Sequence, residues 1–390
     1  MEALLEKGIE GLNLDRSDWQ LVKFGDVAIQ QKQTVDRENT DLTRYVKGEH
    51  MYSEDLHLRK WGELKDEYLG PAFIRKFEEG DILYGSRRTY LRKVAIAPFE
   101  GITSNTTFVI KANEERIDKR LLPYVMLSEG FAQHSIRNSK GSVNPYVNWK
   151  DLSGYEFLLP PIEKQSFISE LFLQLDDAIE KLDLFQKTLA KTKKSFFRAE
   201  IRELDSIKLE KVADVHYGLG QPPEKDDNGV SIIRATDIQR GQINEGSFLK
   251  VKRSAIPKGK KVELINGDII IVRSGAYTGD LAMIPDHLVG SFAGYDLIIR
   301  HFKKEINPIF LAEYLLDDHA QAYFKGESIR SAQPHLNSKQ VLNTNIPELE
   351  LDRQNIISNK LVEYYGLLKD CSNKIRASIL LYKSIINQVF

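Results

Sequence analysis

The chain has 390 residues, of which 42% are hydrophobic and 28% charged, with a formal net charge of −1. These values are typical of a folded protein with two or three domains and exclude a disordered chain. Residues 1–16 lack the apolar run of a signal peptide, no apolar stretch is long enough to cross a membrane, and the single cysteine, Cys371, excludes a disulfide framework, so we expect a cytoplasmic protein.

The near-zero charge by itself does not indicate a nucleic-acid binder. Basic residues nevertheless crowd two short stretches, Arg87, Arg88, Arg92 and Lys93 in the first half and Lys250, Lys252, Arg253, Lys258, Lys260 and Lys261 in the second. Such patches are compatible with phosphate contacts, although Lys-rich turns are also common as solvated surface.

The first half of the chain begins with a strand-rich region. Short β-branched runs at 81–84, 94–97 and 107–110 are separated by Gly, Asn and Pro, which predicts strands, and a helical patch follows at 121–127. The pattern then changes to a heptad stripe behind Pro160 and Pro161, which suit a first helical turn. The stripe is Leu171, Leu175, Ala178, Leu182, Phe185, Leu189, Thr192 and Phe196.

The second half repeats this order. Strands are predicted at 268–272, 281–284 and 296–299, and a helical patch at 310–316. A second stripe runs to the end of the chain through Ile357, Leu361, Tyr364, Leu368, Cys371, Ile375, Ser378, Tyr382, Ile385 and Val389. Each predicted helix has roughly 39 residues and a length of about 58 Å, which one small domain cannot cover.

Three blocks of similar sequence show that the halves are copies. Residues 77–83 align with 264–270 at an offset of 187, and Tyr90 then falls on Tyr277. Residues 21–27 align with 209–215 at an offset of 188. Pro145, Asn148, Lys150 and Gln165 fall on Pro334, Asn337, Lys339 and Gln354 at an offset of 189. Because the blocks keep one order, the sequence indicates an internal duplication.

The duplication predicts the architecture. Two helices of equal length and equal stripe most simply pack on each other as an antiparallel coiled coil, although the stripes could instead bind helices of another protein. We expect an α+β fold with two pseudo-symmetric α/β domains joined by these helices. The expected boundaries are 1–160, 161–201, 202–349 and 350–390, and we expect residues 2–15 to dock near the end of the second helix.

Two similar domains with different loops fit a DNA target read as two unlike half-sites. The whole chain resembles the specificity subunit of type I restriction-modification systems. The resemblance rests on Gly80-Asp81-Ile82 and Gly267-Asp268-Ile269, on the loops of Pro145 and Pro334, and on the helix starts at 159–165 and 350–354. The second helix start lacks the Pro-Pro pair of the first, which leaves its first residue open.

The resemblance implies a non-catalytic subunit with two target-recognition domains and several partners. Those partners are double-stranded DNA, two methyltransferase subunits that grip the helices, and a motor-nuclease subunit. Eight stripe residues are the candidates for partner contact: Leu171, Leu175, Leu182, Leu189, Tyr364, Leu368, Ile375 and Tyr382.

No catalytic, metal or cofactor motif emerges from the sequence. Asn144-Pro145-Tyr146 lacks the second proline of an adenine-methyltransferase motif, and its repeat counterpart is Gln333-Pro334-His335. Gly218-Leu219-Gly220 is interpreted as a flexible turn aligned with residues 30–32, because it lacks the spacing of a nucleotide-binding loop. The eight histidines have no metal-ligand spacing. A fused methyltransferase or nuclease half is therefore disfavoured.

Base reading favours polar and cationic side chains on loops. The candidates in the first half are Arg87, Arg88, Tyr90, Arg92, Asn105, Lys140, Asn144 and Tyr146. Those in the second half are Lys260, Lys261, Arg273, Ser274, Tyr277, Arg330, Gln333 and His335. Each could equally be a solvated surface residue, and the aligned Tyr90 and Tyr277 could be core aromatics. A coiled-coil interaction scaffold that reads no DNA is the alternative function.

Overall fold

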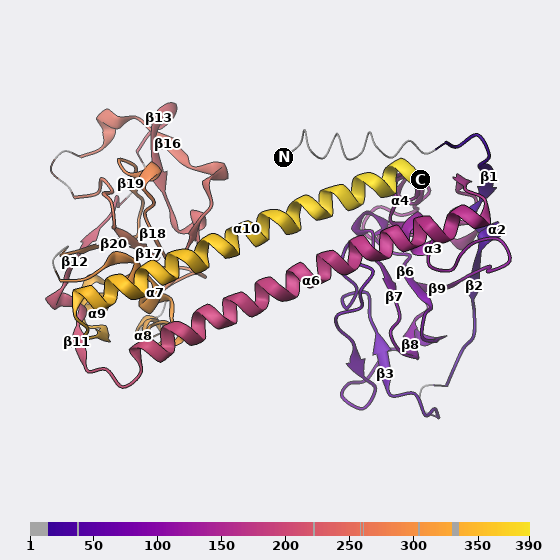
Figure 1. The fold of residues 1–390 in the computed structure, drawn as a ribbon, viewed down its shortest axis with the longest axis horizontal. Helices are drawn as coiled ribbons and strands as arrows, with labels where there is room; N and C mark the ends of the chain where they lie inside the picture. The colour runs from indigo at the N-terminus through magenta and orange to yellow at the C-terminus, as the bar shows by residue number, and fades with distance from the viewer. Residues whose placement is uncertain are drawn as a thin grey trace. The chain divides into compact units, whose positions relative to one another are not determined.

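The computed structural model describes residues 15–36, 39–220, 223–257, 259, 261–302, 305–329 and 335–390. The chain divides into two compact units, residues 1–185 with 371–390, and residues 186–370. Each unit holds one globular domain and a part of both long helices (Figure 1). We call the globular parts the first and the second domain. The predicted docking of residues 2–15 falls outside the described residues except for Asp15.

The first domain is built on two four-stranded sheets, ordered β2-β9-β6-β7 and β4-β3-β8-β5, and a separate pair, β1-β10. Its strands are β1 (Gln20–Lys23), β2 (Ala28–Gln31), β3 (Arg44–Val46), β4 (Gly62–Glu63), β5 (Phe73–Phe77), β6 (Ile82–Gly85), β7 (Val94–Ile96), β8 (Gly101–Ser104), β9 (Thr107–Ala112) and β10 (Glu156–Leu159). Its helices are α2 (Phe24–Val27), α3 (Leu122–Leu127), α4 (Glu129–Arg137) and α5 (Trp149–Leu152).

The second domain has sheets ordered β12-β20-β17-β18 and β16-β13-β19, with the pairs β11-β21 and β14-β15. Its strands are β11 (Ser206–Lys208), β12 (Ala213–Tyr217), β13 (Lys225–Ile233), β14 (Ile238–Gln239), β15 (Gln242–Ile243), β16 (Leu249–Val251), β17 (Ile269–Ile271), β18 (Leu281–Met283), β19 (Phe292–Ala293), β20 (Leu297–His301) and β21 (Asn345–Pro347). Its helices are α7 (Pro308–Leu316), α8 (Asp318–Ser328) and α9 (Ser338–Leu342).

The two domains share one plan. The order β2-β9-β6-β7 corresponds to β12-β20-β17-β18, and the pair β1-β10 corresponds to β11-β21. The same turn precedes both central strands, because the amide of Glu78 donates to the Asp81 carboxylate and the amide of Ile265 donates to the Asp268 carboxylate. The predicted offset of 187 is therefore correct here, and the predicted α+β fold with a duplicated domain is confirmed.

The predicted offset of 188 at the start of each copy is wrong by three residues. Strand pairing sets Ala28 opposite Ala112 and Ala213 opposite His301, which gives an offset of 185. The burial explains the difference, since Leu209 is fully buried like Phe24, whereas Leu21 is 65% exposed. A short pattern of Lys, Asp and Val matched in the wrong register because it carried no information on burial.

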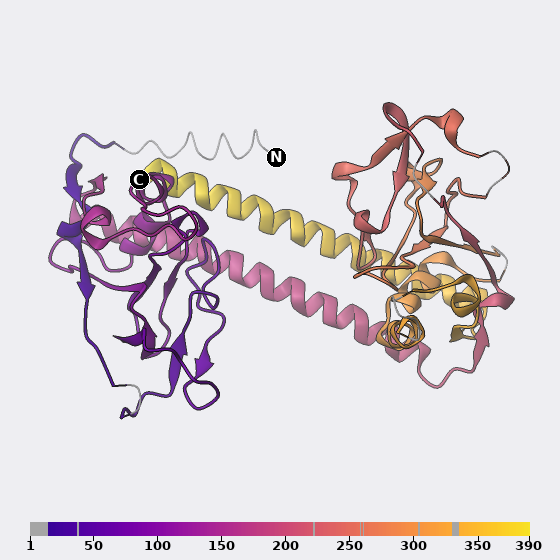
Figure 2. The ribbon, with the colours of Figure 1, turned by 180° about the vertical axis from the view of Figure 1, so that it is seen from behind.

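The two long helices are α6 (Ile162–Ile201) and α10 (Leu351–Val389), of 40 and 39 residues. In the first unit the beginning of α6 lies beside the end of α10 (Figures 1 and 2), and the ring centroids of Phe172 and Tyr382 are 6.3 Å apart. In the second unit the end of α6 meets the beginning of α10, with the rings of Phe196 and Tyr364 5.9 Å apart. The helices thus run antiparallel, as predicted.

Every residue of the predicted α10 stripe is buried or half-buried. In the predicted α6 stripe, every second residue from Ala178 to Thr192 is exposed, and the residue that follows it in the sequence is half-buried instead. Ala178, Phe185 and Thr192 are exposed, whereas their neighbours Ile179, Gln186 and Lys193 are half-buried. The predicted stripe and the observed stripe both advance in alternating steps of four and three residues. Choosing by apolar residue type selected Ala178, Phe185 and Thr192, which is the wrong set. Gln186 and Lys193 were missed because long polar side chains can bury their stems.

Candidate nucleic-acid interface

The repeat places the same two loops together in each domain. In the first domain the loop after β6 meets the loop before α5, because the amide of Arg88 donates to the Pro145 carbonyl at 2.6 Å and that of Val147 to the Ser86 carbonyl at 3.0 Å. In the second domain the amide of Leu336 donates to the Arg273 carbonyl at 2.8 Å. Each domain therefore presents one composite loop surface.

The surface of the first domain gathers five of the predicted residues. Arg87 and Arg88 are exposed, and Arg88 Nε donates to the Asn144 side chain at 3.3 Å. Lys140 and Tyr146 pair through both backbone amides, at 2.8 and 2.9 Å, and the Tyr146 side chain is 42% exposed. The Lys140 ammonium also donates to the Asp151 carboxylate at 3.0 Å and is 57% exposed. The two arginines, this lysine, an amide and an aromatic ring form the kind of surface that contacts phosphates and base edges.

Three other candidates of the first domain take no part in these hydrogen bonds. Tyr90 is exposed in the short helix after Arg88 and is not a core residue. Asn105 lies at the turn between β8 and β9, where its amide donates to the Ala72 carbonyl. The Arg92 guanidinium is held by the carboxylates of Glu54 and Glu129, at 2.6–2.9 Å. These contacts place Arg92 at the junction with the helices, away from the loop surface.

The surface of the second domain is organised around Arg273. Its guanidinium carbon lies 5.0 Å from the ring centroid of Tyr217 and 4.5 Å from that of Tyr295. Arg273 Nη2 is 3.0 Å from Nε2 of His335, whose pKa is lowered by burial and by the arginine charge. The Arg273 amide donates to the Asp296 carboxylate at 3.2 Å, and burial raises the pKa of Asp296 to about 6.

Sequence reasoning named Arg273, Ser274 and His335 but missed Tyr217 and Tyr295. A cavity of about 230 Å³ lies beside the cluster, lined by Leu219, Ile232, Arg234, Ala235, Thr236, Ser274, Gly294, Tyr295 and Asp296. The only signal for the two tyrosines was that each adjoins a glycine. Glycine is required at position 218 by a close approach, since a Cβ there would lie 2.0 Å from the Gly294 carbonyl oxygen. The close approach brings the ends of β12 and β20 together.

The remaining candidates of the second domain are scattered or outside the described residues. Tyr277 is 53% exposed and lines a different cavity, of about 670 Å³, with residues of α6 and α7. Lys261 is exposed at the turn before Val262. Lys260, Arg330 and Gln333 lie outside the described residues.

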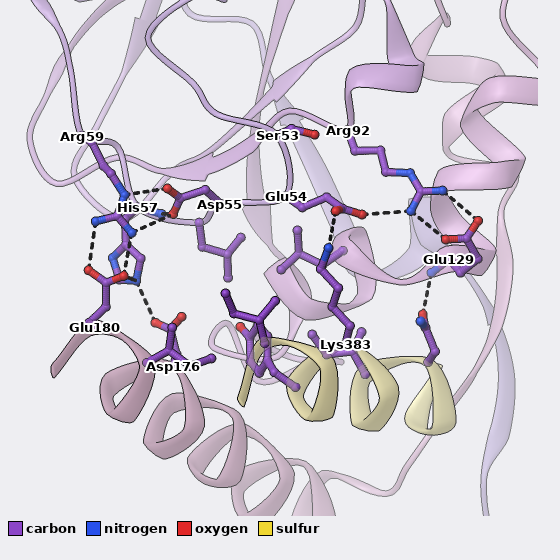
Figure 3. Close-up of a pocket in the computed structure, with 17 residues that line it drawn as sticks. Ser53, Glu54, Asp55, His57, Arg59, Arg92, Glu129, Asp176, Glu180 and Lys383 are labelled. Carbon is purple, nitrogen blue, oxygen red and sulfur yellow. Dashed lines mark hydrogen bonds and ion pairs between the residues drawn. The ribbon is translucent and has the colours of Figure 1, made fainter. Parts of the chain in front are cut away.

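Charged groups join the first domain to the start of α6, beside a cavity of about 640 Å³ (Figure 3). His57 Nε2 lies 2.9 Å from the Asp176 carboxylate, and this hydrogen bond raises the pKa of His57. Arg59 donates to Glu180 at 2.6 and 3.0 Å and to Asp55 at 2.6 Å. The groups satisfy one another, so they fasten the domain to the helix.

The same cavity is bordered by the end of α10. Lys383 Nζ donates to the Glu54 carboxylate at 2.5 Å, and the amide of Glu129 donates to the Asn387 side chain at 2.7 Å (Figure 3). Arg92 bridges Glu54 and Glu129. The first domain is thus held by both helices.

In the second unit, different side chains join the domain to the helices. Lys193 of α6 donates to the Glu313 carboxylate at 2.6 and 2.7 Å, and Glu313 also accepts from the Tyr365 hydroxyl. The side chains of Lys193 and Glu313 are only 15% and 8% exposed. The equivalents of Lys193 and Glu313 in the first unit are the buried Tyr382 and Tyr124, whose rings are 6.1 Å apart.

The eight predicted partner residues mostly face the other helix or a domain within their own unit. Tyr382 is buried in the core of the first unit, and the other seven are half-buried. Apolar side chains that are exposed on the helices include two equivalent pairs, at an offset of 189. Phe167 and Ile356 are 70% and 60% exposed, and Leu173 and Val362 are 37% and 50% exposed.

Two kinds of site are missing from the described part of the chain. Its His, Cys, Asp and Glu side chains form no group of three or more that could hold a metal ion. None of its helices is long and apolar enough to cross a membrane.

Two copies of one α/β domain, each with a loop surface that carries cationic and aromatic side chains, are the plan of a two-module recognition protein. The sequence model for the type I restriction modification DNA specificity domain matches residues 16–187 and again residues 202–381. The chain therefore belongs to this family. It is a recognition subunit rather than an enzyme, and the scaffold alternative finds no support.

Several known proteins are similar to this chain over most of its length. The chain is 24% identical to the type I restriction enzyme MjaVIII specificity subunit of Methanocaldococcus jannaschii, over 93% of this chain and 89% of that protein. It is 20% identical to the EcoBI specificity subunit of Escherichia coli, over 72% and 67%. Its fold is similar to a crystal structure of a type I S subunit from M. genitalium, with a TM-score of 0.62 and 12% identity over 97% and 98% of the two chains.

Proposed function

We propose that this chain is the sequence-specificity subunit of a type I restriction-modification complex, and that its two domains read the two halves of an asymmetric DNA target. The observation that carries the proposal is that equivalent loop positions hold different side chains. Ser86 and Arg87 in the first domain correspond to Arg273 and Ser274 in the second, and Tyr146 corresponds to His335. Side chains that differ at the same place present different hydrogen-bonding groups, so the half-sites differ.

The first half-site falls to the loop surface that carries Arg87, Arg88, Lys140, Asn144 and Tyr146. The second falls to the surface of Arg273, Ser274 and His335, extended by Tyr217 and Tyr295. We assign the spacing between the half-sites to the helix pair, because α6 and α10 are uninterrupted over 40 and 39 residues. Helices held side by side are stiffer than a linker of loops.

The partners in this proposal are double-stranded DNA, two methyltransferase subunits and a motor-nuclease subunit. Two copies of a methyltransferase fit the duplicated exposed pairs, Phe167 with Leu173 and Ile356 with Val362. Exposed apolar side chains at equivalent places are a natural basis for binding one partner twice. Most of the stripe residues contribute indirectly, by holding the two helices together. A cytoplasmic location completes the proposal, because the host DNA lies there.

The test is to sequence the methylated bases of a host that carries this gene with its neighbouring methyltransferase gene, against the same host without it. A new asymmetric two-part motif with modified adenine on both strands is expected. A complex that folds and co-purifies but adds no motif would refute the proposal.

The methyltransferase contacts have a separate test. Phe167→Glu and Ile356→Glu should each remove one methyltransferase copy from the purified complex, measured as mass by light scattering. Gln174→Glu, an exposed change on α6, is the matched control and should retain both copies. Two retained copies in both Glu variants would show that these faces are not the binding sites.

A further inference from the structure

Two aromatic rings lie against the guanidinium of Arg273. Tyr217 and Tyr295 lie 5.0 and 4.5 Å from its central carbon, and both tyrosines are about half exposed, at 46% and 50%. Cation–π contacts of this kind restrict the orientation of the guanidinium plane without using its N–H groups. Arg273 is thus oriented before any ligand binds.

The hydrogen-bonding state of Arg273 differs between the two edges of its guanidinium. Nε is buried and has no hydrogen-bond partner among the described residues, while Nη2 lies 3.0 Å from His335 Nε2. Among the described residues, Nη1 has no hydrogen-bond partner. Each of these terminal nitrogens carries two N–H groups and His335 meets only one of the four, so Nη1 and Nη2 keep donors for a ligand.

We propose that Arg273 reads a guanine in the half-site bound by the second domain; this rests on the proposed function. Two parallel N–H donors at a fixed spacing match the O6 and N7 acceptors that guanine presents in the major groove. His335 and the two tyrosines are positioning residues, since they act through the guanidinium.

The buried Asp296 contacts the backbone of Arg273. Its carboxylate accepts from the Arg273 amide and is only 2% exposed, and one of its oxygens has no hydrogen-bond partner among the described residues. This hydrogen bond fixes the backbone from which the Arg273 side chain extends. The equivalents of Arg273 and Asp296 in the first domain are Ser86 and Thr107. This reader therefore belongs to the second domain alone.

The first experiment uses the full chain in complex with its methyltransferase, after the two-part motif has been determined. We expect Arg273→Ala to lower the discrimination at one G·C pair of one half-site by about 10- to 100-fold, with the other half-site unchanged. Arg273→Lys should restore it only in part, because an ammonium can reach O6 and N7 but lacks the planar fork and the stacking on the tyrosines. Competition binding against all four base pairs at each position is the measurement.

A second experiment changes the DNA in place of the protein. Replacing that guanine by 7-deazaguanine removes the N7 acceptor and should weaken binding by the wild-type complex about tenfold, while the Arg273→Ala complex loses nothing further. The wild-type result alone shows whether N7 is contacted, and the comparison with Arg273→Ala, or with Arg273→Lys if Arg273→Ala unfolds, assigns that contact to Arg273.

Two controls distinguish a loss of base recognition from a loss of folding or of positive charge. Arg240→Ala removes an exposed arginine of the same domain, on the β14–β15 hairpin that Gly241 places against Leu316, and should leave the discrimination intact. His335→Gln retains a hydrogen-bond acceptor and should keep the preference for guanine, whereas His335→Leu should lose it. Equal effects of Gln and Leu would mean that His335 does not position the guanidinium.

Three results would overturn the inference. A second half-site without any G·C pair excludes a guanine reader. A loss of affinity that is equal for all sequences and makes the salt dependence shallower would identify Arg273 as a phosphate contact. Unchanged discrimination in Arg273→Ala would exclude both roles. If the wild-type complex reads no sequence at all, the proposed function fails first and this inference falls with it.

Discussion

Gln165 lies in the first turn of α6, and Gln354 lies in the first turn of α10. Both make the same hydrogen bonds to the adjoining domain, so replacing either one tests how strongly these bonds stabilise its unit. Gln165 Oε1 accepts from the Asp118 amide at 2.7 Å, and its Nε2 donates to the Pro160 carbonyl at 2.9 Å. Gln354 repeats both bonds, with the Asn307 amide at 2.8 Å and the Leu349 carbonyl at 2.7 Å. The two side chains are 1% and 2% exposed.

We predict that Gln165→Met destabilises the first unit by about 2–4 kcal/mol. Two short hydrogen bonds of about 0.5–1 kcal/mol each are lost, together with a long one to the Arg116 carbonyl at 3.4 Å. A buried amide and a buried carbonyl also lose their partner, which adds about 1–2 kcal/mol. Methionine keeps the length of the side chain, so packing changes little. Gln354→Met should destabilise the second unit by a similar amount, because its contacts are the same.

Urea unfolding measures both effects. The three tryptophans, Trp19, Trp61 and Trp149, all belong to the first unit, so their fluorescence reports on that unit alone. The Gln165→Met midpoint should fall by on the order of 1 M urea. Gln354→Met should leave the fluorescence midpoint nearly unchanged and should increase hydrogen exchange in β20 and α7.

The matched control is Gln174→Met, which changes an exposed glutamine of the same helix and should alter the free energy of unfolding by less than about 0.5 kcal/mol. A Gln165→Met effect no larger than that of the control would refute the hydrogen-bonding argument.

Three further predictions follow from the packing of the two units. Lys193→Met should destabilise the second unit by about 3–5 kcal/mol in urea unfolding, because Glu313 is left charged and buried, and adding Glu313→Met should recover most of the loss. The pKa of His57 is raised in the folded chain, so its pairing with Asp176 stabilises fully below about pH 6.5 and is lost as the pH rises through the higher folded value; wild type should exceed His57→Gln in stability at pH 5.5 but hardly at pH 8.5. Gly218→Ala should lower the melting temperature and weaken reading of the second half-site, since its Cβ would lie 2.0 Å from the carbonyl oxygen of Gly294; an unchanged melting curve would contradict the close approach.

The duplicated architecture could be predicted from the sequence because its signals are local or repeated. Helical periodicity located both long helices, and repeated motifs aligned Gln165 with Gln354, whose hydrogen bonds prove to be the same. Periodicity depends only on residues that are close in the sequence, so it can be recognised without any knowledge of the fold. The family resemblance came from the same order of motifs.

The details of the candidate surfaces were decided by tertiary structure. Arg92 looked like a surface cation, but Glu54 and Glu129 lie far from it in sequence and bind it at the helix junction. Tyr217 and Tyr295 flank Arg273 only because β12 and β20 pair in the sheet. Contacts between distant segments depend on strand register and on the burial of each side chain. The amino-acid sequence determined that there are two similar reading modules, and only the tertiary structure decided which side chains each module brings together.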